Sequence, residues 1–218
     1  MASVPLPNGA QVALATTLAA AITISDISNA NPAEASSTAH GLSAGGIILL
    51  NNGWPRTDNS VRRVAGPTID AFNIEGLNST NLDRFPDGGG AGTARALTAW
   101  TQLPKIPTFE LTGGDPKNGT TSYIDYEKDY DYFTGTNPER LNFTISYQPG
   151  TAAYDALVAA NDSGVLQVIR LVLKDGSTLY YPGQLFFNKA PVTVKDQEMV
   201  NNVSLALQGE ITRYAKLP

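Results

Sequence analysis

The fold is decided most clearly by residues 141–150, which read Leu-Asn-Phe-Thr-Ile-Ser-Tyr-Gln-Pro-Gly. Apolar and polar side chains alternate from Leu141 to Gln148. Successive side chains of a β-strand point to opposite faces, so this alternation predicts a strand with one buried face and one polar face. Pro149-Gly150 ends the strand, because proline lacks the amide donor that a sheet needs.

A short helix is predicted directly after this strand. Thr151 is a favourable N-cap residue, and Gly164 is typical of a helix C-terminus. The segment between them carries one mostly apolar stripe at helical spacing: Tyr154, Leu157, Val158 and Asn161. We therefore expect this helix to pack its stripe against the sheet that contains residues 141–148.

More strands are predicted between the helix and the C-terminus. Val165–Leu173 is nearly all apolar, which is typical of a strand covered on both faces. Asp175-Gly176 is a hairpin-turn signal. In residues 199–212 apolar side chains share one parity, and small or uncharged polar side chains share most of the other. The predicted strands are Val165–Leu173, Thr178–Tyr181, Leu185–Phe187, Val192–Val194 and residues 199–212.

Residues 22–96 are richer in Asn, Ser, Thr, Gly and Ala, and turn signals divide them into short apolar runs. The runs are Ile22–Ile27, Gly46–Leu50, Val61–Val64 and Phe72–Leu77. The whole chain is expected to be all-β. We predict a β-sandwich of antiparallel sheets with one short flanking α-helix from residues 1–21 and 97–218, and a small all-β insertion without helices from residues 22–96.

Composition limits the classes of function. Charged residues make up 16 % of the chain, against roughly 25 % in an average protein, and a weakly charged surface favours self-association. The net charge of -5 argues against a basic surface that wraps nucleic acid. The absence of cysteine excludes disulfides, thiolate nucleophiles and zinc–thiolate sites.

The N-terminal apolar segment is predicted to be a strand. Residues 12–21 superficially resemble the core of a secretory signal, but the first basic residue is Arg56, so the positive flank that a signal needs is missing. No apolar run approaches the ~18–20 residues of a membrane helix. A soluble protein is expected, with no membrane partner.

Enzymatic sites are not predicted. His40 is the only histidine, so a serine–histidine triad or most zinc sites would have to use it. It lies in a turn-like stretch, and a hydrogen-bonded turn residue is the preferred interpretation. The glycine-rich segment Gly88–Gly92 precedes no predicted helix and is interpreted as a turn rather than a phosphate-binding loop. We expect no catalytic, metal or cofactor-binding residue.

Residues 123–133 are unusual because they combine tyrosines with carboxylates. With a period of two, the acids fall on one side of the segment, and Ile124 and most tyrosines fall on the other. A calcium site, the solvated face of an edge strand, and a hairpin arm that docks on a neighbouring subunit are the three interpretations. Docking is favoured because tyrosine is enriched at interfaces. The predicted interface residues are Tyr123, Asp125, Tyr126, Glu127, Asp129, Tyr130, Asp131, Tyr132 and Phe133.

The order of the elements from Pro138 to Tyr214 resembles the core of the lambda-type siphophage tail tube family. The similar elements are the alternating strand, Pro149-Gly150, the helix, the apolar strand, Tyr181–Asn188, the terminal strands, and the hairpins Lys174-Asp-Gly-Ser-Thr and Val192-Thr-Val-Lys-Asp. Upstream, the segment from Phe109–Gly114 through Thr134–Pro138 resembles the long loop of that family. The resemblance implies that this loop reaches an adjacent subunit or ring.

The resemblance further implies a structural, non-enzymatic protein of the virion tail that is assembled in the host cytoplasm. Copies would form rings, hexameric in the family, whose strands join edge to edge and whose stack conducts DNA without binding it specifically. The implied partners are copies of the chain and the tape measure, terminator and baseplate proteins. The polar faces of the two alternating strands supply the candidates for the channel lining: Asn142, Thr144, Ser146, Gln148, Ser204, Gln208, Glu210 and Thr212.

The stretch from Ala30 to Thr80 resembles a small β-module inserted in phage structural proteins and related to a half-domain of ubiquitin-activating enzymes. Without a cysteine, ubiquitin chemistry is not implied, and the module is expected on the outside of the tube. Another ring protein of the tail or of a type VI secretion tube is the first alternative. A carbohydrate-binding module or a carboxylate glycosidase is the second, with Trp54, Trp100 and the tyrosines stacking on sugar.

Overall fold

Strands dominate the fold, as the all-β prediction requires. The computed structural model describes residues 8–216, so the first seven residues of the predicted sandwich lie outside the described range. The module, residues 22–96, contains β2 (Ile22–Ile24), β3 (Asp26–Ile27), β4 (Ala33–Ser36), β5 (Ile47–Asn52), β6 (Ser60–Ala65) and β7 (Ala71–Ile74). The other elements are β1 (Gln11–Leu18), β8 (Gly92–Leu103), β9 (Thr108–Thr112), β10 (Pro116–Thr121), β11 (Tyr130–Thr136), β12 (Arg140–Ser146), α1 (Ala152–Ser163), β13 (Leu166–Val172), β14 (Thr178–Phe187), β15 (Val200–Leu207) and β16 (Thr212–Tyr214).

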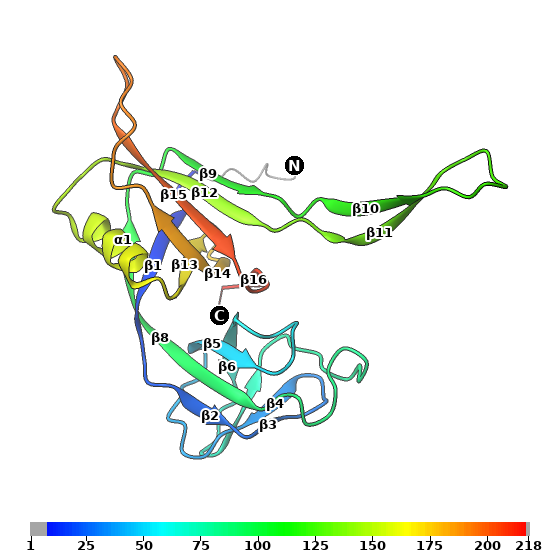
Figure 1. The fold of residues 1–218 in the computed structure, drawn as a ribbon. Coiled ribbons are helices and arrows are strands. Elements are labelled where there is room, and N and C mark those ends of the chain that lie inside the picture. The colour runs from blue at the N-terminus through cyan, green and yellow to red at the C-terminus, as the bar shows by residue number, and fades with distance from the viewer. Residues whose placement is uncertain (1–7, 217–218) are drawn as a thin grey trace, which may run out of the picture.

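Fourteen strands form one continuous antiparallel sheet, in the order β3-β4-β7-β6-β5-β8-β1-β13-β14-β15-β12-β9, with β2 on β8 and β16 on β14. Strand β8 joins the two parts of this sheet and crosses from the module to the sandwich (Figure 1). Its first residues, Gly92–Ala96, pair with β5, and Leu97–Leu103 pair with β1. The predicted boundary between residues 96 and 97 therefore falls inside a single strand.

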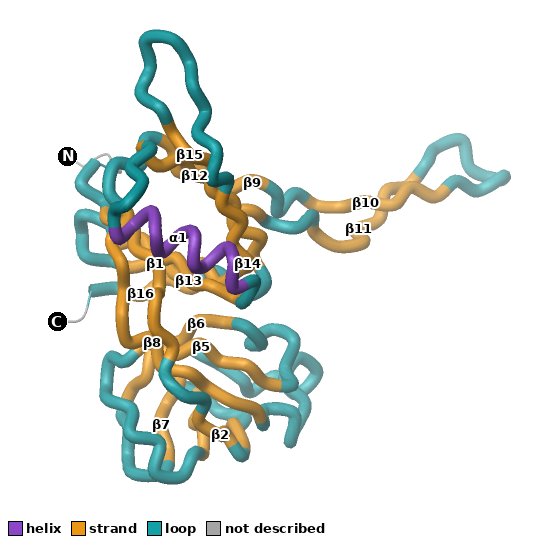
Figure 2. Tube along the Cα trace, turned by 60° about the vertical axis from the view of Figure 1, so that its left-hand side comes forward, coloured by secondary structure: helices purple, strands orange, loops and turns teal. Residues whose placement is uncertain are grey.

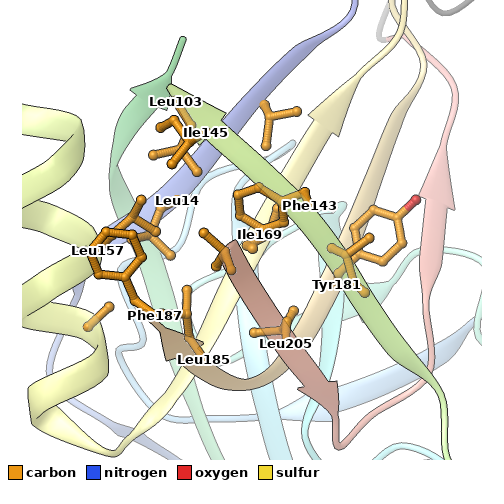
Figure 3. Close-up of a cluster of buried hydrophobic side chains, with 14 of the residues drawn as sticks. Leu14, Leu103, Phe143, Ile145, Leu157, Ile169, Tyr181, Leu185, Phe187 and Leu205 are labelled. Atoms are coloured by element: carbon orange, nitrogen blue, oxygen red, sulfur yellow. The ribbon is translucent and has the colours of Figure 1, made fainter. Parts of the chain in front are cut away.

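The core of the sandwich lies between the curved sheet and α1 (Figure 3). Leu141, Phe143 and Ile145 of β12 point into it and are buried, so the alternation predicted for this strand is confirmed. The neighbouring strands and the helix add Leu14, Leu157, Ile169, Leu185, Phe187 and Leu205. Strand β13 is covered on both faces, as predicted, because Ile169 enters this core while Val168 enters a second cluster on the opposite face.

Helix α1 begins and ends at the predicted residues. The Oγ1 atom of the N-cap Thr151 accepts a hydrogen bond from the Tyr154 amide at 3.4 Å. Gly164 ends the helix in a left-handed conformation with φ of 62°, which costs glycine little because it has no Cβ. Leu157 is fully buried at the centre of the stripe. At twelve residues, this sole helix of residues 8–216 is too short to cross a membrane.

The module has a core of its own and, as predicted, no helix. Trp54 is its largest buried side chain, and the indole Nε1 donates a hydrogen bond to the Pro86 carbonyl at 2.8 Å. Ile24, Phe72 and Ile74 pack around it in the same cluster. Strand β4, which pairs with β7, was not predicted from the sequence because its residues, Ala-Glu-Ala-Ser, form no apolar run.

The C-terminal strands differ from the prediction in three places. β14 is one strand and not two, because Pro182 and Gly183 lie inside it. The Pro182 carbonyl accepts a hydrogen bond from the Gln208 amide at 3.1 Å, on the side away from β13, so the missing proline amide costs no ladder bond to β13. The predicted strand over residues 199–212 is interrupted between β15 and β16. Val192 makes only an isolated bridge to Val200, so no strand forms at residues 192–194.

The module packs directly on the outer face of the sandwich. Ala15, Val168 and Tyr180 of that face form one buried cluster with Leu49 and Val61 of the module. The sandwich face would be exposed without the module, since these side chains point away from the core beneath α1. The two cores are therefore joined by a third apolar cluster as well as by β8.

Polar contacts made by Tyr214 also stabilise the junction between the module and the sandwich. The Arg63 amide donates to the Tyr214 hydroxyl at 3.1 Å, and the Arg63 guanidinium lies over the Tyr214 ring, 4.6 Å from its centroid. Glu75 hydrogen-bonds and pairs with the same guanidinium, which raises the pKa of Arg63. Burial raises the pKa of Tyr214. Two residues earlier on the same strand, Thr212 Oγ1 donates to the Val61 carbonyl at 2.9 Å.

We predict that Tyr214→Phe lowers the free energy of unfolding by about 1–3 kcal/mol, because the buried Arg63 amide loses its acceptor while the ring stays in place. Chemical denaturation followed by circular dichroism measures this change. Tyr123→Phe, which removes an exposed hydroxyl, serves as the control and should leave the midpoint unchanged. An unaltered midpoint for Tyr214→Phe would show that the hydroxyl does not hold the junction.

Candidate assembly surfaces

A long hairpin arm, residues 113–138, projects from the body of the protein (Figures 1 and 2). Strands β9 and β12 of the sheet continue into it as β10 and β11, which pair with each other in a separate two-stranded sheet. Neither β10 nor β11 packs extensively on any other element. Residues 123–133 form most of the turn of this hairpin and the first part of β11, and the tip lies far from both hydrophobic cores.

Two glycines bend the ribbon where the arm leaves the sheet. Gly113 and Gly114 have φ angles of 89° and 78°, which L-residues rarely adopt. A Cβ on Gly113 would lie 2.1 Å from the carbonyl oxygen of Pro138, which connects β11 to β12 on the other side of the hairpin. The Gly114 amide donates to the Asn137 carbonyl at 3.1 Å, which keeps the two strands paired through the bend. The direction of the arm is therefore set by backbone geometry.

Large apolar side chains cover the arm and are left exposed to water. Ile124 at the tip is fully exposed, and Phe133 is 66 % exposed. The other exposed side chains of this group are Tyr123, Tyr126, Tyr130 and Tyr132. The rings of Tyr126 and Tyr130 pack edge to face, with centroids 5.5 Å apart, but nothing outside the arm covers them. An apolar patch of this kind is typical of a protein-binding surface.

The carboxylates of the arm do not form the single row expected from period two. Residues 122–129 make up the turn, and only Tyr130–Phe133 of the segment lie in a strand. Asp131 accepts a hydrogen bond from Thr120 Oγ1 at 2.7 Å. Asp125, Glu127 and Asp129 make no ion pair with the rest of residues 8–216. No group of three or more His, Asp and Glu side chains in this range is placed to hold a metal ion.

A polar face is formed by the outer side of β9, β12 and β15. Asn142 accepts a hydrogen bond from Ser204 Oγ at 2.8 Å and donates to Thr112 Oγ1 at 3.0 Å. The hydroxyls of Thr108 and Thr144 are 2.8 Å apart. A shallow hollow on the sheet is lined by Thr108, Asn142, Thr144 and Ser204, together with Glu110 and Phe186. The polar face is therefore largely uncharged and cross-linked by its own hydrogen bonds.

The other channel candidates lie elsewhere. Ser146 is buried, and its hydroxyl donates to the Lys105 carbonyl at 3.3 Å. Thr212 is buried because the module covers that part of the outer face. Neither can form part of an exposed surface of the chain. Gln148 lies beyond the end of β12, and Gln208 and Glu210 lie in the interruption between β15 and β16.

Strand β9 was missed by the sequence analysis, which placed a loop at Phe109–Gly114. It pairs with β12 from Thr108 to Thr112 and is the last strand of the sheet order, so its other edge is unpaired within residues 8–216. Its residues, Thr-Phe-Glu-Leu-Thr, alternate between polar and apolar side chains, although only Phe109 packs against the core. The signal for a short strand was therefore present, but the segment was interpreted as part of the long loop of the family.

His40 has a structural role. Its Nδ1 accepts a hydrogen bond from the Leu42 amide at 3.0 Å, and its Nε2 lies 3.3 Å from the Ala71 carbonyl. The ring is buried edge to face against Phe72, with centroids 5.1 Å apart. The interpretation as a hydrogen-bonded turn residue is confirmed.

Comparison with known proteins gives one family. The sequence model of the family described as phage tail tube protein, TTP, matches residues 52–216. The match begins at the last residue of β5, so it includes β6 and β7 of the module and every element from β8 to β16. No curated protein matches the chain.

We predict that the turn of the arm, residues 122–129, contributes nothing to the stability of the unassembled chain. Thr121 and Tyr130 are paired across the hairpin, so residues 122–129 can be replaced by an Asn-Gly turn without changing the register. The free energy of unfolding should change by less than about 0.5 kcal/mol, because the tip packs on nothing outside the arm. Leu157→Ala, measured in the same denaturation series, should cost about 2–5 kcal/mol. A large loss from the turn replacement would mean that the arm contacts the body.

Proposed function

This chain belongs to the phage tail tube protein family, and from that premise we propose that it assembles into stacked rings, hexameric as the resemblance implies, that form the conduit through which DNA leaves the virion. Each copy is a structural subunit of the virion tail. The observation that carries the proposal is the arm. It holds six large apolar side chains away from both cores, where only another molecule can cover them.

Ring formation gives the unpaired edge of β9 a partner. A free edge presents amide and carbonyl groups that can pair with any exposed strand, so it is an aggregation hazard in a monomer. In a closed ring, each β9 edge pairs with a strand of the next copy, so β9 no longer presents a free edge. The arm, which continues β9 and β12, then reaches the neighbouring subunit or ring and covers its aromatic side chains there.

The polar face is the proposed lining of the channel. Asn142, Thr144 and Ser204 present amides and hydroxyls without formal charge, and the chain as a whole carries a net charge of -5. Such a wall has few groups that attract phosphates, so DNA can pass along it without being held. Glu110 adds a negative charge on the same face.

The module is proposed to lie on the outside of the tube. It covers the part of the outer sandwich face that bears Tyr180 and Tyr214, away from the polar face of β9, β12 and β15. Assembly in the host cytoplasm, and contacts with the tape measure, terminator and baseplate proteins, follow from this role. No step of the role needs a catalytic residue or a cofactor.

We predict that the purified protein forms tubes of uniform width with a central stain-filled channel, seen by negative-stain electron microscopy. The double substitution Tyr126→Ala and Phe133→Ala should raise the protein concentration needed for assembly by about 30-fold or more, since buried aromatic anchors contribute about 2 kcal/mol or more to an interface. Sedimentation velocity measures the free and assembled fractions.

Ile69→Ala is the matched control, because Ile69 is an exposed apolar residue of the module, away from the arm. It should assemble like the unaltered protein. Single rings that never stack would instead favour a terminator or baseplate component. A compact monomer at high concentration, with its tail partners present, would contradict the proposal.

A further inference from the structure

Three arginines surround a small cavity at the junction of the module and the sandwich. The cavity, of about 270 Å³, is lined by Arg56, Arg62, Arg84 and Glu210 together with Thr57, Gly76, Leu77, Asn78 and Phe85. We call it the arginine pocket. Three guanidinium groups face a single carboxylate there, so the lining carries two more positive than negative charges. In a chain with a net charge of -5, this surplus is unusual.

Arg62 is the buried member of the pocket, with only 8 % of its surface exposed. Its Nε donates to Ser60 Oγ at 3.0 Å, and this is the one hydrogen bond its side chain makes within residues 8–216. One terminal nitrogen lies 3.7 Å from a Glu210 carboxylate oxygen. A buried charge is costly unless it is both paired and hydrogen-bonded, so the Arg62 guanidinium has unused capacity to bind an anion.

Glu210 alone does not satisfy the hydrogen-bonding capacity of the three guanidinium groups in the arginine pocket. Its carboxylate is 3.4 Å from Arg56 and 3.7 Å from Arg62, whereas charge-assisted hydrogen bonds between such groups are typically about 2.7–2.9 Å. Arg84 makes no ion pair within residues 8–216. A second carboxylate in the cavity would supply the acceptors that the three guanidiniums lack.

We propose that the arginine pocket is an anion-binding site whose ligand is a carboxylate from the arm tip of a second copy of this chain. Guanidinium groups bind carboxylates through paired hydrogen bonds, which fixes the partner's orientation as well as its charge. The arm tip offers Asp125, Glu127 and Asp129, none of which has an ion-pair partner in its own chain. This inference rests on the proposed ring assembly and names the acceptor of the arm.

The contact cannot be made within one molecule. The arm projects away from the body, and β10 and β11 make no extensive contact with the module (Figure 1). Arm and pocket are different surfaces, so the contact between two copies is heterologous: each copy donates its arm to one neighbour and offers its pocket to another. Contacts of this kind build closed rings or open stacks, which are the assemblies a tube requires.

A charge-swap experiment tests the pairing. Arg56→Glu with Arg84→Glu reverses the two exposed arginines and leaves the buried Arg62 in place, so the fold is preserved. A second variant reverses the charge of the arm tip by the substitutions Asp125→Lys, Glu127→Lys and Asp129→Lys. For each of these two variants, the protein concentration needed for assembly should rise by about 30-fold or more. Sedimentation velocity and negative-stain microscopy measure this concentration. The chain that carries both reversals should assemble at close to the original concentration, because opposite charges again meet.

Lys174→Glu with Lys195→Glu is the control, since it changes the net charge by the same amount as the pocket reversal at exposed sites outside the pocket. It should assemble normally. Normal assembly of the pocket reversal, or failure of the double reversal to restore assembly, would overturn the inference while the proposed function stands. Failure of the unaltered protein to form rings would overturn both.

A calorimetric titration with inorganic phosphate separates a pocket for free anions from a pocket for the arm. Phosphate should bind the unaltered, unassembled protein weakly, should not bind the pocket reversal, and should inhibit assembly by competing with the arm. Two results together would assign the pocket to a free anion and contradict the arm as its ligand. Phosphate would bind the unaltered protein without inhibiting its assembly, and the arm reversal would assemble normally.

Discussion

The architecture depends on one constraint, which is that the single strand β8 belongs to both parts of the continuous sheet. β8 supplies hydrogen bonds to β5 at one end and to β1 at the other, so the module and the sandwich share a continuous ladder. The apolar cluster around Tyr180 and the hydrogen bonds of Tyr214 then hold the module against the sandwich. A module held in this way moves with the sandwich, so its surface has a fixed position relative to the arm and the polar face.

Local signals in the sequence predicted the elements that local interactions determine. The alternation of residues 141–147, the Thr151 and Gly164 caps and the Asp175-Gly176 turn each depend on neighbours a few residues away, and each is present in the structure. The errors arose where distant chain segments decide. Pro182 was expected to end a strand, but it sits opposite the interruption between β15 and β16, where no amide is needed. Gly209 lies in that interruption, where a Cβ would approach the Asn59 carbonyl of the module within 2.2 Å, which no local pattern indicates.

The sequence indicated the arm but not the arginine pocket, again because local patterns show only what neighbouring residues determine. The residues of the arm are contiguous, and their mixture of tyrosine and carboxylate is visible in the sequence. The arginine pocket joins residues 56, 62, 84 and 210, which are brought together only by the packing of the module on the sandwich. Glu210 had been assigned to the channel from its parity, but the interruption after β15 turns it towards the arginines instead.

The position of β1 determines when the sandwich can be completed during synthesis of the chain. β1 lies between β8 and β13, so one of its two edges stays unpaired until β13, which ends at Val172, has been made. The strands of the module, including the first residues of β8, are all made by residue 96 and pair among themselves, so the module can form earlier. Pairings between distant segments are slow because a long loop must close first. A chain whose translation is unfinished therefore lacks a complete sandwich, because β13, which pairs with β1, has not yet been made.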